Sequence, residues 1–200
     1  SILTLLGIVI GVASVIAVVT LVNGADAFVN SKFSSYGANV FTVSKMPLLI
    51  TSADDYVRFQ KRKDILFSDY HYVLENCKLC TGMGAQQTTV GKVVHGIQSV
   101  TDTQIRGYTW EMPSLQNLNI VQGRDFTDAD EQHASHVCIV GSDIVDHLLT
   151  GLDPLGQELR VDGVPYTIIG VGEKQGSTFG ASQDNWVGVP LHTYQKTYRS

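Results

Sequence analysis

An unbroken apolar run opens the chain. Residues 2–22 read ILTLLGIVIGVASVIAVVTLV, hold no charged side chain, and carry polar groups only as the hydroxyls of Thr4, Ser14 and Thr20. A helix of about 20 residues, rising ~1.5 Å each, crosses a hydrocarbon core ~30 Å thick and pairs its own backbone groups there. Signal peptides have shorter apolar cores, of roughly 7–15 residues, followed by a small-residue cleavage site. The run therefore predicts a transmembrane helix, and a buried core helix is the weaker alternative.

Small residues within this run predict a partner helix. Gly7 and Gly11 form a GxxxG pattern, and we interpret Ala13 and Ala17 as continuing the same small-residue strip. Small side chains let helices approach closely inside lipid, where hydrophobicity cannot drive their association. Glycine is also common in membrane helices in general, so the pattern leaves both explanations open.

The helical pattern continues past residue 22 as a predicted stalk, residues 23–36. Apolar residues recur at intervals of three and four while polar residues fill the other side, which is typical of one helix leaving the bilayer with an apolar stripe. We expect the helix to end near Gly37, because glycine suits a left-handed C-terminal cap. A strand at residues 40–43 should follow. The stripe consists of Val22, Ala25, Val29, Phe33 and Tyr36.

The remaining pattern alternates short helical and β-prone runs, which predicts an α+β domain behind the membrane helix and stalk. Residues 46–63 and 175–184 are expected to be loops, and the helix at 68–76 should lie on a small sheet. The other expected helices cover 114–118, a turn from Thr127 and a segment capped by Ser142 through residue 149. The expected strands cover residues 85–90, 92–97, 103–108, 136–140, 158–161, 164–171 and 186–189.

Three tight turns punctuate the second half of the chain. Residues 123–126 read GRDF, and Asp153-Pro154-Leu155-Gly156 should turn the chain into the strand at 158–161. Asp162-Gly163 lies between two alternating apolar runs. This is the strongest short-range hairpin signal, because both central residues of a type I′ turn adopt positive φ.

Composition narrows the classes of partner. The 200 residues carry 19 Asp and Glu against 14 Lys and Arg, for a net charge of −5, and 44% are hydrophobic. This net negative charge argues against binding to the phosphate backbone of a nucleic acid. We expect the short basic patch at residues 58–63 to be a loop and a solvent-exposed face. Outside the membrane helix there is material for one or two small domains. Because the chain begins at Ser1 and stops within an apparent helix start, we expect it to be a fragment.

Cys77 and Cys80 form a CxxC pattern, which is found in redox pairs and in half of a zinc site. The third cysteine, Cys138, lies in an apolar strand without a neighbouring cysteine, so a four-thiolate site cannot form. A catalytic redox pair needs CxxC at a helix N-terminus, whereas this pair follows a predicted helix. We therefore expect a helix-terminal disulfide or two plain thiols.

The other candidate chemistry is weak. His133 and His136 lie near Asp128, Asp130 and Glu131, but the stretch lacks the sixth-position glycine of a calcium loop. The Gly-Lys at residues 91–92 lacks both the earlier glycine and the following hydroxyl of a phosphate loop, and no serine-hydrolase elbow or zinc-peptidase motif is present. We expect no catalytic residue, no metal site and no cofactor.

The order of these segments resembles a known family. The opening LTLLGIVIGVASVIAVVTLVNGADAFVNSKFSSYGANVFTVS resembles the first transmembrane helix, stalk and first strand of ABC transporter permeases of the MacB/FtsX type. NIVQGRDFTDAD, VCIVGSDIVDHLL, DPLGQELRVDG, YTIIGV and NWVGVPLHTY are similar, in the same order, to that family's extracytoplasmic domain. The CxxC has no counterpart that we associate with the family.

The resemblance implies an architecture. Such permeases have four transmembrane helices with a large extracytoplasmic domain between the first two, and they work as dimers with a fused or separate cytoplasmic ATPase. The domain divides into a porter subdomain and an inserted sabre subdomain. By that pattern we place the membrane helix and stalk at residues 1–37, the porter at 38–107 plus 176–200, and the sabre at 108–175.

The implied function is mechanical. A cytoplasmic ABC ATPase would move paired membrane helices of the inner membrane, and the stalk would carry that motion to the extracytoplasmic domain for export or mechanotransmission. The implied partners are the membrane, a second permease copy, the ATPase and a periplasmic adaptor, and the chain itself would not be an enzyme. The alternative from another class is a single-span membrane-anchored sensor or redox domain, and an anchored enzyme is the weakest hypothesis.

Overall fold

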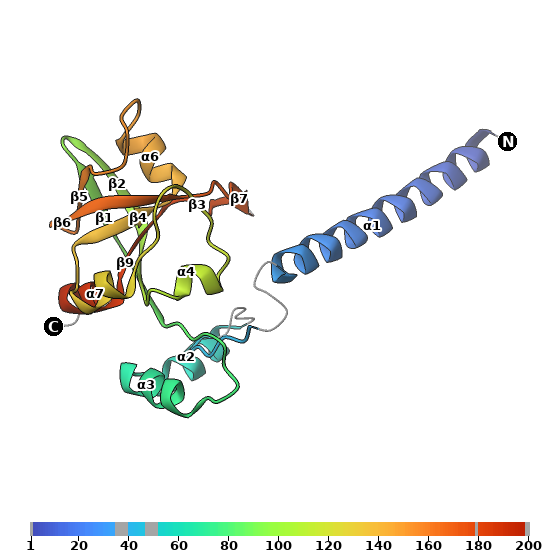
Figure 1. Ribbon diagram of the computed structural model, residues 1–200. Coiled ribbons are helices and arrows are strands. Elements are labelled where there is room, and N and C mark those ends of the chain that lie inside the picture. Colours follow the sequence, from blue (N-terminus) through green and yellow to red (C-terminus); the bar gives the residue numbers. More distant parts are fainter. Residues whose placement is uncertain (1, 35–39, 47–51, 179, 199–200) are drawn as a thin grey trace. The chain divides into compact units, whose positions relative to one another are not determined.

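The computed structural model describes residues 2–34, 40–46, 52–178 and 180–198. Internal contacts divide the chain into two units, Ser1–Phe41 and Thr42–Ser200. Figure 1 shows the first as one helix and the second as a sheet with short helices. This boundary falls close to the predicted end of the stalk.

The first unit is built on helix α1, Ile2–Ser34, which runs without a break through the predicted span and into the predicted stalk (Figure 1). The continuous helix expected from the apolar period is thus confirmed as far as Ser34. The strand predicted at residues 40–43 is wrong, because these residues form no ladder. Val40, Phe41 and Val43 are all exposed, so a β-prone run here has neither a partner strand nor a core to pack against.

The second unit contains short helices and strands in mixed order, which agrees with the predicted α+β class. Its helices are α2 Ala53–Gln60, α3 Phe67–Asn76, α4 Met112–Leu115, α5 Asp128–Gln132, α6 Ser142–Leu148 and α7 Leu191–Tyr198. Its strands are β1 Gln86–His95, β2 Gln98–Tyr108, β3 Ile120–Gly123, β4 Val137–Val140, β5 Glu158–Val161, β6 Val164–Gly172, β7 Ser177–Thr178, β8 Ala181–Ser182 and β9 Trp186–Pro190.

Seven strands in the described part of the chain form one sheet, in the order β3-β6-β4-β9-β2-β1-β5. Strand β5 pairs with β1 and also with β6, so six of these strands close into a ring, and β3 is added to it beside β6. We call this closed sheet the barrel. The β2–β9 and β4–β6 pairs are parallel, whereas the other neighbours are antiparallel. Closure leaves few free edges and encloses a core.

The barrel interior is apolar. Buried and exposed positions alternate in β5, where Leu159 and Val161 point inward, whereas β9 is buried at every position. The enclosed cluster includes Ile105, Cys138 and Ile168, all nearly fully buried. A second cluster gathers Tyr108, Phe126, Ile139 and Trp186. This burial, at about 25 cal/mol per Å² of apolar surface, is the main stabilising term.

The first hairpin corrects the prediction of three short strands. The runs predicted at residues 85–90 and 92–97 are one strand, β1, and the run at 103–108 is part of β2. Gly91 does not end a strand. The register shifts between Gly91 and Val93, and a side chain at Gly91 would collide with the Asp162 carboxylate. The glycine thus marks a β-bulge where another segment approaches closely.

Several helix predictions need correction. The predicted loop at 46–63 contains helix α2, whose cap Ser52 accepts a hydrogen bond from the Asp55 amide at 3.2 Å. Helix α3 has no buried residue and does not lie on the sheet, whereas α6 and α7 pack beside it (Figure 1). Helix α6 is capped by Gly141, so Ser142 is its first residue and not its cap.

Other boundaries also moved. The short helix predicted at residues 114–118 is α4, which begins earlier because Pro113 suits its first turn. Strand β3 was not predicted. The polar segment at 175–184 includes the β7–β8 pair, and buried Asp184 accepts backbone hydrogen bonds from Gln175 and Gly176 at 2.8 and 2.7 Å.

The two predicted turns around β5 are confirmed. Gly156 has φ 78°, and the Asp153 carboxylate accepts a hydrogen bond from the Leu155 amide at 3.2 Å across Pro154. Asp162 and Gly163 have φ of 48° and 89°, as a type I′ turn requires.

Asp162 also has a role that its turn position did not predict. Its carboxylate accepts hydrogen bonds from the Lys92 amide of β1, at 2.8 Å, and from the Tyr198 hydroxyl of α7, at 2.6 Å. Burial, and then the contact with Asp162, raises the pKa of Tyr198. One side chain therefore ties the β5–β6 hairpin, strand β1 and helix α7 together.

Helix α5 opens with a capping box. Its cap Thr127 accepts a hydrogen bond from the Asp130 amide, at 3.3 Å, while the Asp130 carboxylate accepts one from the Thr127 amide, at 2.9 Å. Arg124 donates to both carboxylate oxygens of Asp130, at 2.7 and 3.2 Å. Arg124 first, and then Thr127, lowers the pKa of Asp130 to about 2 against the opposing effect of burial.

We predict that replacing Asp162 with Ala lowers the free energy of unfolding by about 3 kcal/mol, because two hydrogen bonds to a charged acceptor are lost and Ala resists positive φ. Tyr198→Phe removes only one of those bonds and should cost about 1 kcal/mol. Urea unfolding of the chain in detergent measures both. A variant D162A no less stable than Y198F would contradict the role of Asp162.

We also predict a pH-dependent contribution from Arg124. Because the pKa of Asp130 is lower in the folded protein than in the unfolded chain, this stabilisation is complete above pH ~4 and is lost as the pH falls toward 2. Since Arg124 is half exposed, we expect Arg124→Gln to cost about 1–2 kcal/mol at pH 6 and almost nothing at pH 2. Unfolding midpoints of both proteins across this range test the prediction, and a pH-independent difference would oppose it.

Candidate functional site

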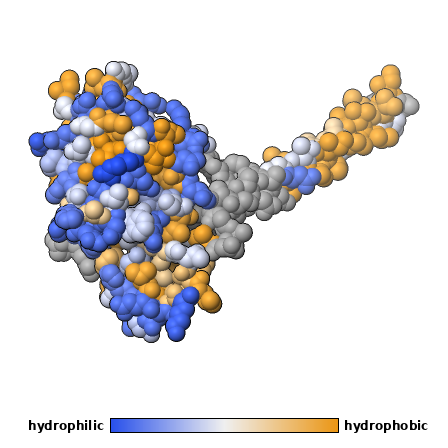
Figure 2. All heavy atoms as spheres, viewed as in Figure 1, coloured by the Kyte–Doolittle hydropathy of each residue, from blue (hydrophilic) through white to orange (hydrophobic). Residues whose placement is uncertain are grey.

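Helix α1 carries a candidate membrane span at Thr4–Gly24, with a mean hydropathy of 2.9 and no buried side chain. Figure 2 shows hydrophobic residues along most of the visible face of this helix. Ser14 and Thr20 donate their hydroxyl hydrogens to the carbonyl groups of Ile10 and Ile16, each at 2.8 Å. These polar groups of the span are therefore satisfied within the helix, as lipid requires.

The predicted small residues of the span lie on two faces. Successive residues of an α-helix turn by about 100°, so Gly7 and Gly11 lie near one line and Ala13 and Ala17 near another, about 120° around the axis. They form two small-residue pairs, not the single strip inferred from the sequence. A side chain at Gly7 or Gly11 would meet nothing within 4 Å in this chain.

The predicted stalk stripe lies partly on the same helix. The structure places Val22, Ala25, Val29 and Phe33 on the unbroken α1, where their spacing keeps them within about 80° of one another. Tyr36 and Gly37 lie outside the described residues. The 33 residues of α1 span about 50 Å, which exceeds a ~30 Å hydrocarbon core by several turns.

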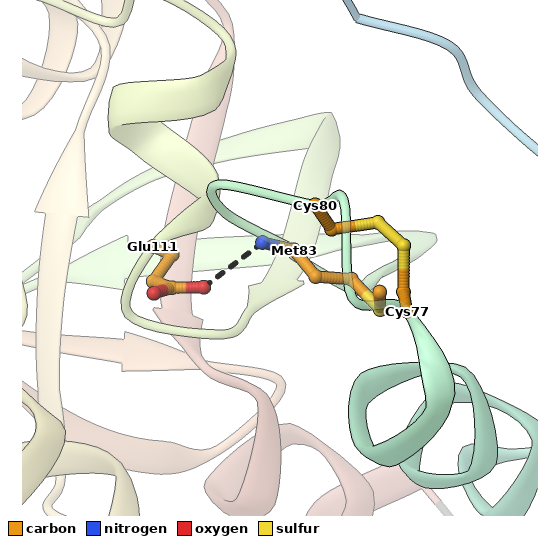
Figure 3. The surroundings of a disulfide bond; sticks show 4 residues. All are labelled: Cys77, Cys80, Met83 and Glu111. Carbon is orange, nitrogen blue, oxygen red and sulfur yellow. Dashed lines mark hydrogen bonds between the residues drawn. A yellow bond between two sulfur atoms is a disulfide. The ribbon is translucent and has the colours of Figure 1, made fainter.

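In the second unit, residues 83–85 attach the chain that follows α3 to the barrel. The Met83 amide donates to the Glu111 carboxylate at 3.1 Å (Figure 3). The Ala85 amide donates to the Thr109 hydroxyl at 2.9 Å, and the Thr109 amide donates to the Ala85 carbonyl at 3.0 Å. These bonds extend the β1–β2 pairing beyond the end of the hairpin, so residues 83–85 are fixed to the barrel.

Helix α3 makes fewer contacts with the rest of its unit. The Tyr70 hydroxyl donates to the Met83 carbonyl at a long 3.4 Å, and the Phe67 ring meets the His192 ring of α7 edge-on, with centroids 5.5 Å apart. Burial is the largest of the effects that raise the pKa of Tyr70. His192 in turn lies 3.1 Å from the Glu131 carbonyl oxygen. We call the contacts of Phe67, Tyr70 and Met83 the α3 junction.

Cys77 and Cys80 form a disulfide, one of the two arrangements that the sequence left open. Cys77 is the C-terminal cap of α3, and Figure 3 shows the bond joining the end of this helix to the loop before Met83. The partial negative charge at a helix C-terminus disfavours a thiolate, so the position does not suit a catalytic redox pair. A loop of four residues constrains the unfolded chain by only about 2 kcal/mol.

The acidic and histidine side chains near α5 have separate partners. Asp130 pairs with Arg124, Glu131 accepts the Trp110 amide at 2.8 Å, and His133 lies 2.8 Å from the Ala129 carbonyl oxygen. Burial raises the pKa of Glu131. His136 lies apart, against the Tyr166 ring. Within the described residues, no three His, Cys, Asp or Glu side chains gather as a metal site.

Sequence reasoning missed the α3 junction and the links of Asp162. The junction depends on backbone groups of Met83, which carry no side-chain signature. Asp162 was recognised for its turn, but its bond to Tyr198 joins residues 36 positions apart, and no local pattern predicts such a pairing. One signal of the Asp162 contact was available in the sequence. Gly91 is a single glycine within a β-prone run, and such a glycine indicates that another segment approaches the strand closely.

The chain matches known proteins along its whole length. The family model of the MacB-like periplasmic core domain covers residues 1–200. The macrolide export ATP-binding/permease protein MacB of Azoarcus sp. (strain BH72) is 30% identical over 194 residues, which are 96% of this chain and 28% of that protein. The pyoverdine export ATP-binding/permease protein PvdT of Pseudomonas savastanoi pv. phaseolicola (strain 1448A / Race 6) is 29% identical over 198 residues, 94% of this chain and 27% of that protein. The chain thus spans little more than a quarter of these relatives.

Solved structures support the fold. The periplasmic region of MacB from Actinobacillus actinomycetemcomitans matches with a TM-score of 0.63 and 19% identity, over 75% of this chain and 65% of that one. The extracellular domain of the noncanonic ABC-type transporter YknZ from Gram-positive bacteria matches with a TM-score of 0.54 and 20% identity, over 66% of this chain and 67% of that one. Because the family model matches every residue and the fold agrees, the chain belongs to the family of the MacB-like periplasmic core domain.

Proposed function

We propose that this chain is the first membrane helix and extracytoplasmic domain of a permease subunit in an ATP-driven ABC exporter. In this proposal a cytoplasmic ATPase, fused or separate, moves the membrane helices, and the chain carries that motion to its extracytoplasmic domain. The relatives named above are export ATP-binding/permease proteins, which supports this class of function. The transported substrate is left open.

One observation carries the mechanical part of the proposal. Helix α1 contains an apolar span of 21 residues and continues without interruption for ten residues more, to Ser34. A continuous helix keeps its hydrogen-bond ladder across the boundary between lipid and water, so a displacement at one end reaches the other. A simple anchor has no need of such an extension.

The disulfide supports the extracytoplasmic side of the proposal. Disulfides persist in oxidising compartments and are rare in the cytosol. Cys77 and Cys80 both belong to the second unit, which the proposal places outside the inner membrane.

The subdomains and partners also remain proposals. A porter at residues 38–107 plus 176–200 and a sabre at 108–175 would share the barrel, because β9 of the first pairs with β4 of the second. The proposed partners are a second permease copy, the ATPase and a periplasmic adaptor. The two small-residue pairs of α1 would pack against different membrane helices.

We predict that Val29→Pro uncouples the extracytoplasmic domain from the ATPase. Proline removes a backbone hydrogen bond and kinks a helix at a cost of about 3 kcal/mol or more. In the full-length protein in nanodiscs, spin labels on exposed Ile97 of two copies should report an ATP-dependent change of distance in the unmodified protein and none in the variant. ATP hydrolysis should stay within about twofold.

The matched control is Val29→Ala, which shortens the same side chain and leaves the helix intact. It should retain the distance change. If Val29→Pro also retained the full change, the stalk would not be the coupling element.

We also predict that the two small-residue pairs contact different helices. A photo-crosslinking residue at Gly7 or Gly11 should capture one neighbour, and the same residue at Ala13 or Ala17 should capture another, identified by mass spectrometry of the membrane-embedded protein. Val12 faces away from both pairs by the same 100° geometry, so a probe there should give no protein crosslink. Identical partners from both pairs would contradict this arrangement.

A further inference from the structure

The disulfide between Cys77 and Cys80 is the one chemical feature that the proposed export function does not use. Both cysteines lie in an accessible segment: Cys80 is exposed, Cys77 is half-buried, and Leu79 between them is 96% exposed. Cys138 is fully buried in β4, and burial raises the pKa of its thiol. Reagents in solution therefore reach the disulfide and not the third cysteine.

The disulfide acts mainly through its position in the chain, and its contribution to the free energy of unfolding is small. It spans only four residues, so it constrains the unfolded chain little. It instead lies between α3, which has no buried residue, and Met83, whose amide donates to Glu111 at the start of α4 two residues before the Ala85–Thr109 pairing. Figure 3 shows the two sulfur atoms bridging this short stretch of chain.

The bond shortens the covalent link between α3 and the barrel. Along the backbone, five residues separate Cys77 from Met83, whereas only two separate Cys80 from Met83. Through the disulfide, the Cys77–Cys80 bridge spans 5.6 Å between Cα atoms, about one and a half backbone steps of ~3.8 Å, so the link shortens from six such steps to about four and a half. The chance that the two ends of a link meet falls with about the 3/2 power of its length, so the bond favours contact about 1.5-fold. The contacts this favours are the Tyr70–Met83 hydrogen bond and the Phe67–His192 ring contact.

We propose that Cys77–Cys80 is a reversible redox clasp, which a dithiol reductant of the oxidoreductase class opens and whose opening loosens the attachment of α3 to the barrel. A thiolate of the reductant attacks Sγ of the more exposed Cys80 and breaks its bond to Cys77, which leaves as a thiolate and takes up a proton. The second thiol of the reductant then attacks the mixed disulfide, frees Cys80 as a thiol and closes the reductant's own disulfide. Two electrons and two protons thus pass to the clasp.

The clasp is a substrate of such exchange and not itself an oxidoreductase. The end of α3 gives its thiolates no positive dipole, so the reduced pair is a weak nucleophile. Once released, α3 has only ten residues, and isolated helices shorter than about 12–15 residues are marginal in water. The fraction of α3 that undocks when the bond opens therefore also loses helical structure.

The consequence for export depends on the proposed function. Helix α3 lies in sequence between the stalk and the barrel. Loosening it would make this part of the chain less able to transmit movement of the stalk to the barrel. The clasp itself is tested without nucleotide or substrate, and its failure is therefore distinguishable from a failure of the export proposal.

Hydrogen exchange of the full chain in detergent tests the clasp. The oxidised protein, the protein treated with dithiothreitol, and the variant Cys77→Ser/Cys80→Ser are compared, with amides of β4, β6 and β9 as the internal reference. Exchange in α3 and in residues 77–83 should rise about 1.5-fold or more on reduction, while the barrel strands change by less than about 1.2-fold. The double variant should match the reduced protein and should not respond to dithiothreitol.

Two results would overturn the proposal. One is unchanged exchange in α3 after thiol labelling has confirmed that both cysteines are reduced. The other is that labelling of Cys77 and Cys80 always accompanies labelling of Cys138, since the bond would then open only when the barrel unfolds.

Discussion

Closure of the sheet by β5 is the constraint on which the second unit depends. One strand of four residues pairs with β1 on one edge and with β6 on the other, so segments from the beginning and the middle of the domain share one ladder. The parallel pairing of β2 with β9 then brings the last strand beside the first hairpin. Asp162, at the turn after β5, holds this closure and helix α7 with one carboxylate. Helix α7 is therefore linked, through Asp162, to the β1–β5 pairing that closes the barrel.

The sequence predicts best where local chemistry dominates. An apolar run determines α1, because no soluble packing can compete with a span of 21 such residues, and paired positive φ determines the Asp162-Gly163 turn. The sequence predicts poorly where a distant partner decides. Residues 40–43 have strand-forming side chains but no partner strand, and Gly91 looked like an interruption because the Asp162 side chain that it accommodates is far away in sequence.

The candidate site divides in the same way. The residues of α1 could be named from the sequence, but the separation of Gly7 and Gly11 from Ala13 and Ala17 requires the geometry of a continuous helix. The α3 junction could not be predicted from the sequence. It joins the Tyr70 hydroxyl to a backbone carbonyl and the Phe67 ring to a helix at the far end of the chain, α7. Helix α3 is accordingly a weakly held part of the second unit, and weakly held elements are where proteins open first.

The burial of Cys138 has a consequence for how the chain matures. In the proposed extracytoplasmic location the three thiols of this chain would meet an oxidising compartment, and a pair that included Cys138 would block folding, because Cys138 belongs to the buried core of the barrel. With only two residues between them, Cys77 and Cys80 stay close together along the chain whether or not it is folded, which favours their pairing with each other. Completion of the barrel then withdraws Cys138 from thiol exchange altogether. The short spacing of Cys77 and Cys80 and the burial of Cys138 thus favour the same pairing.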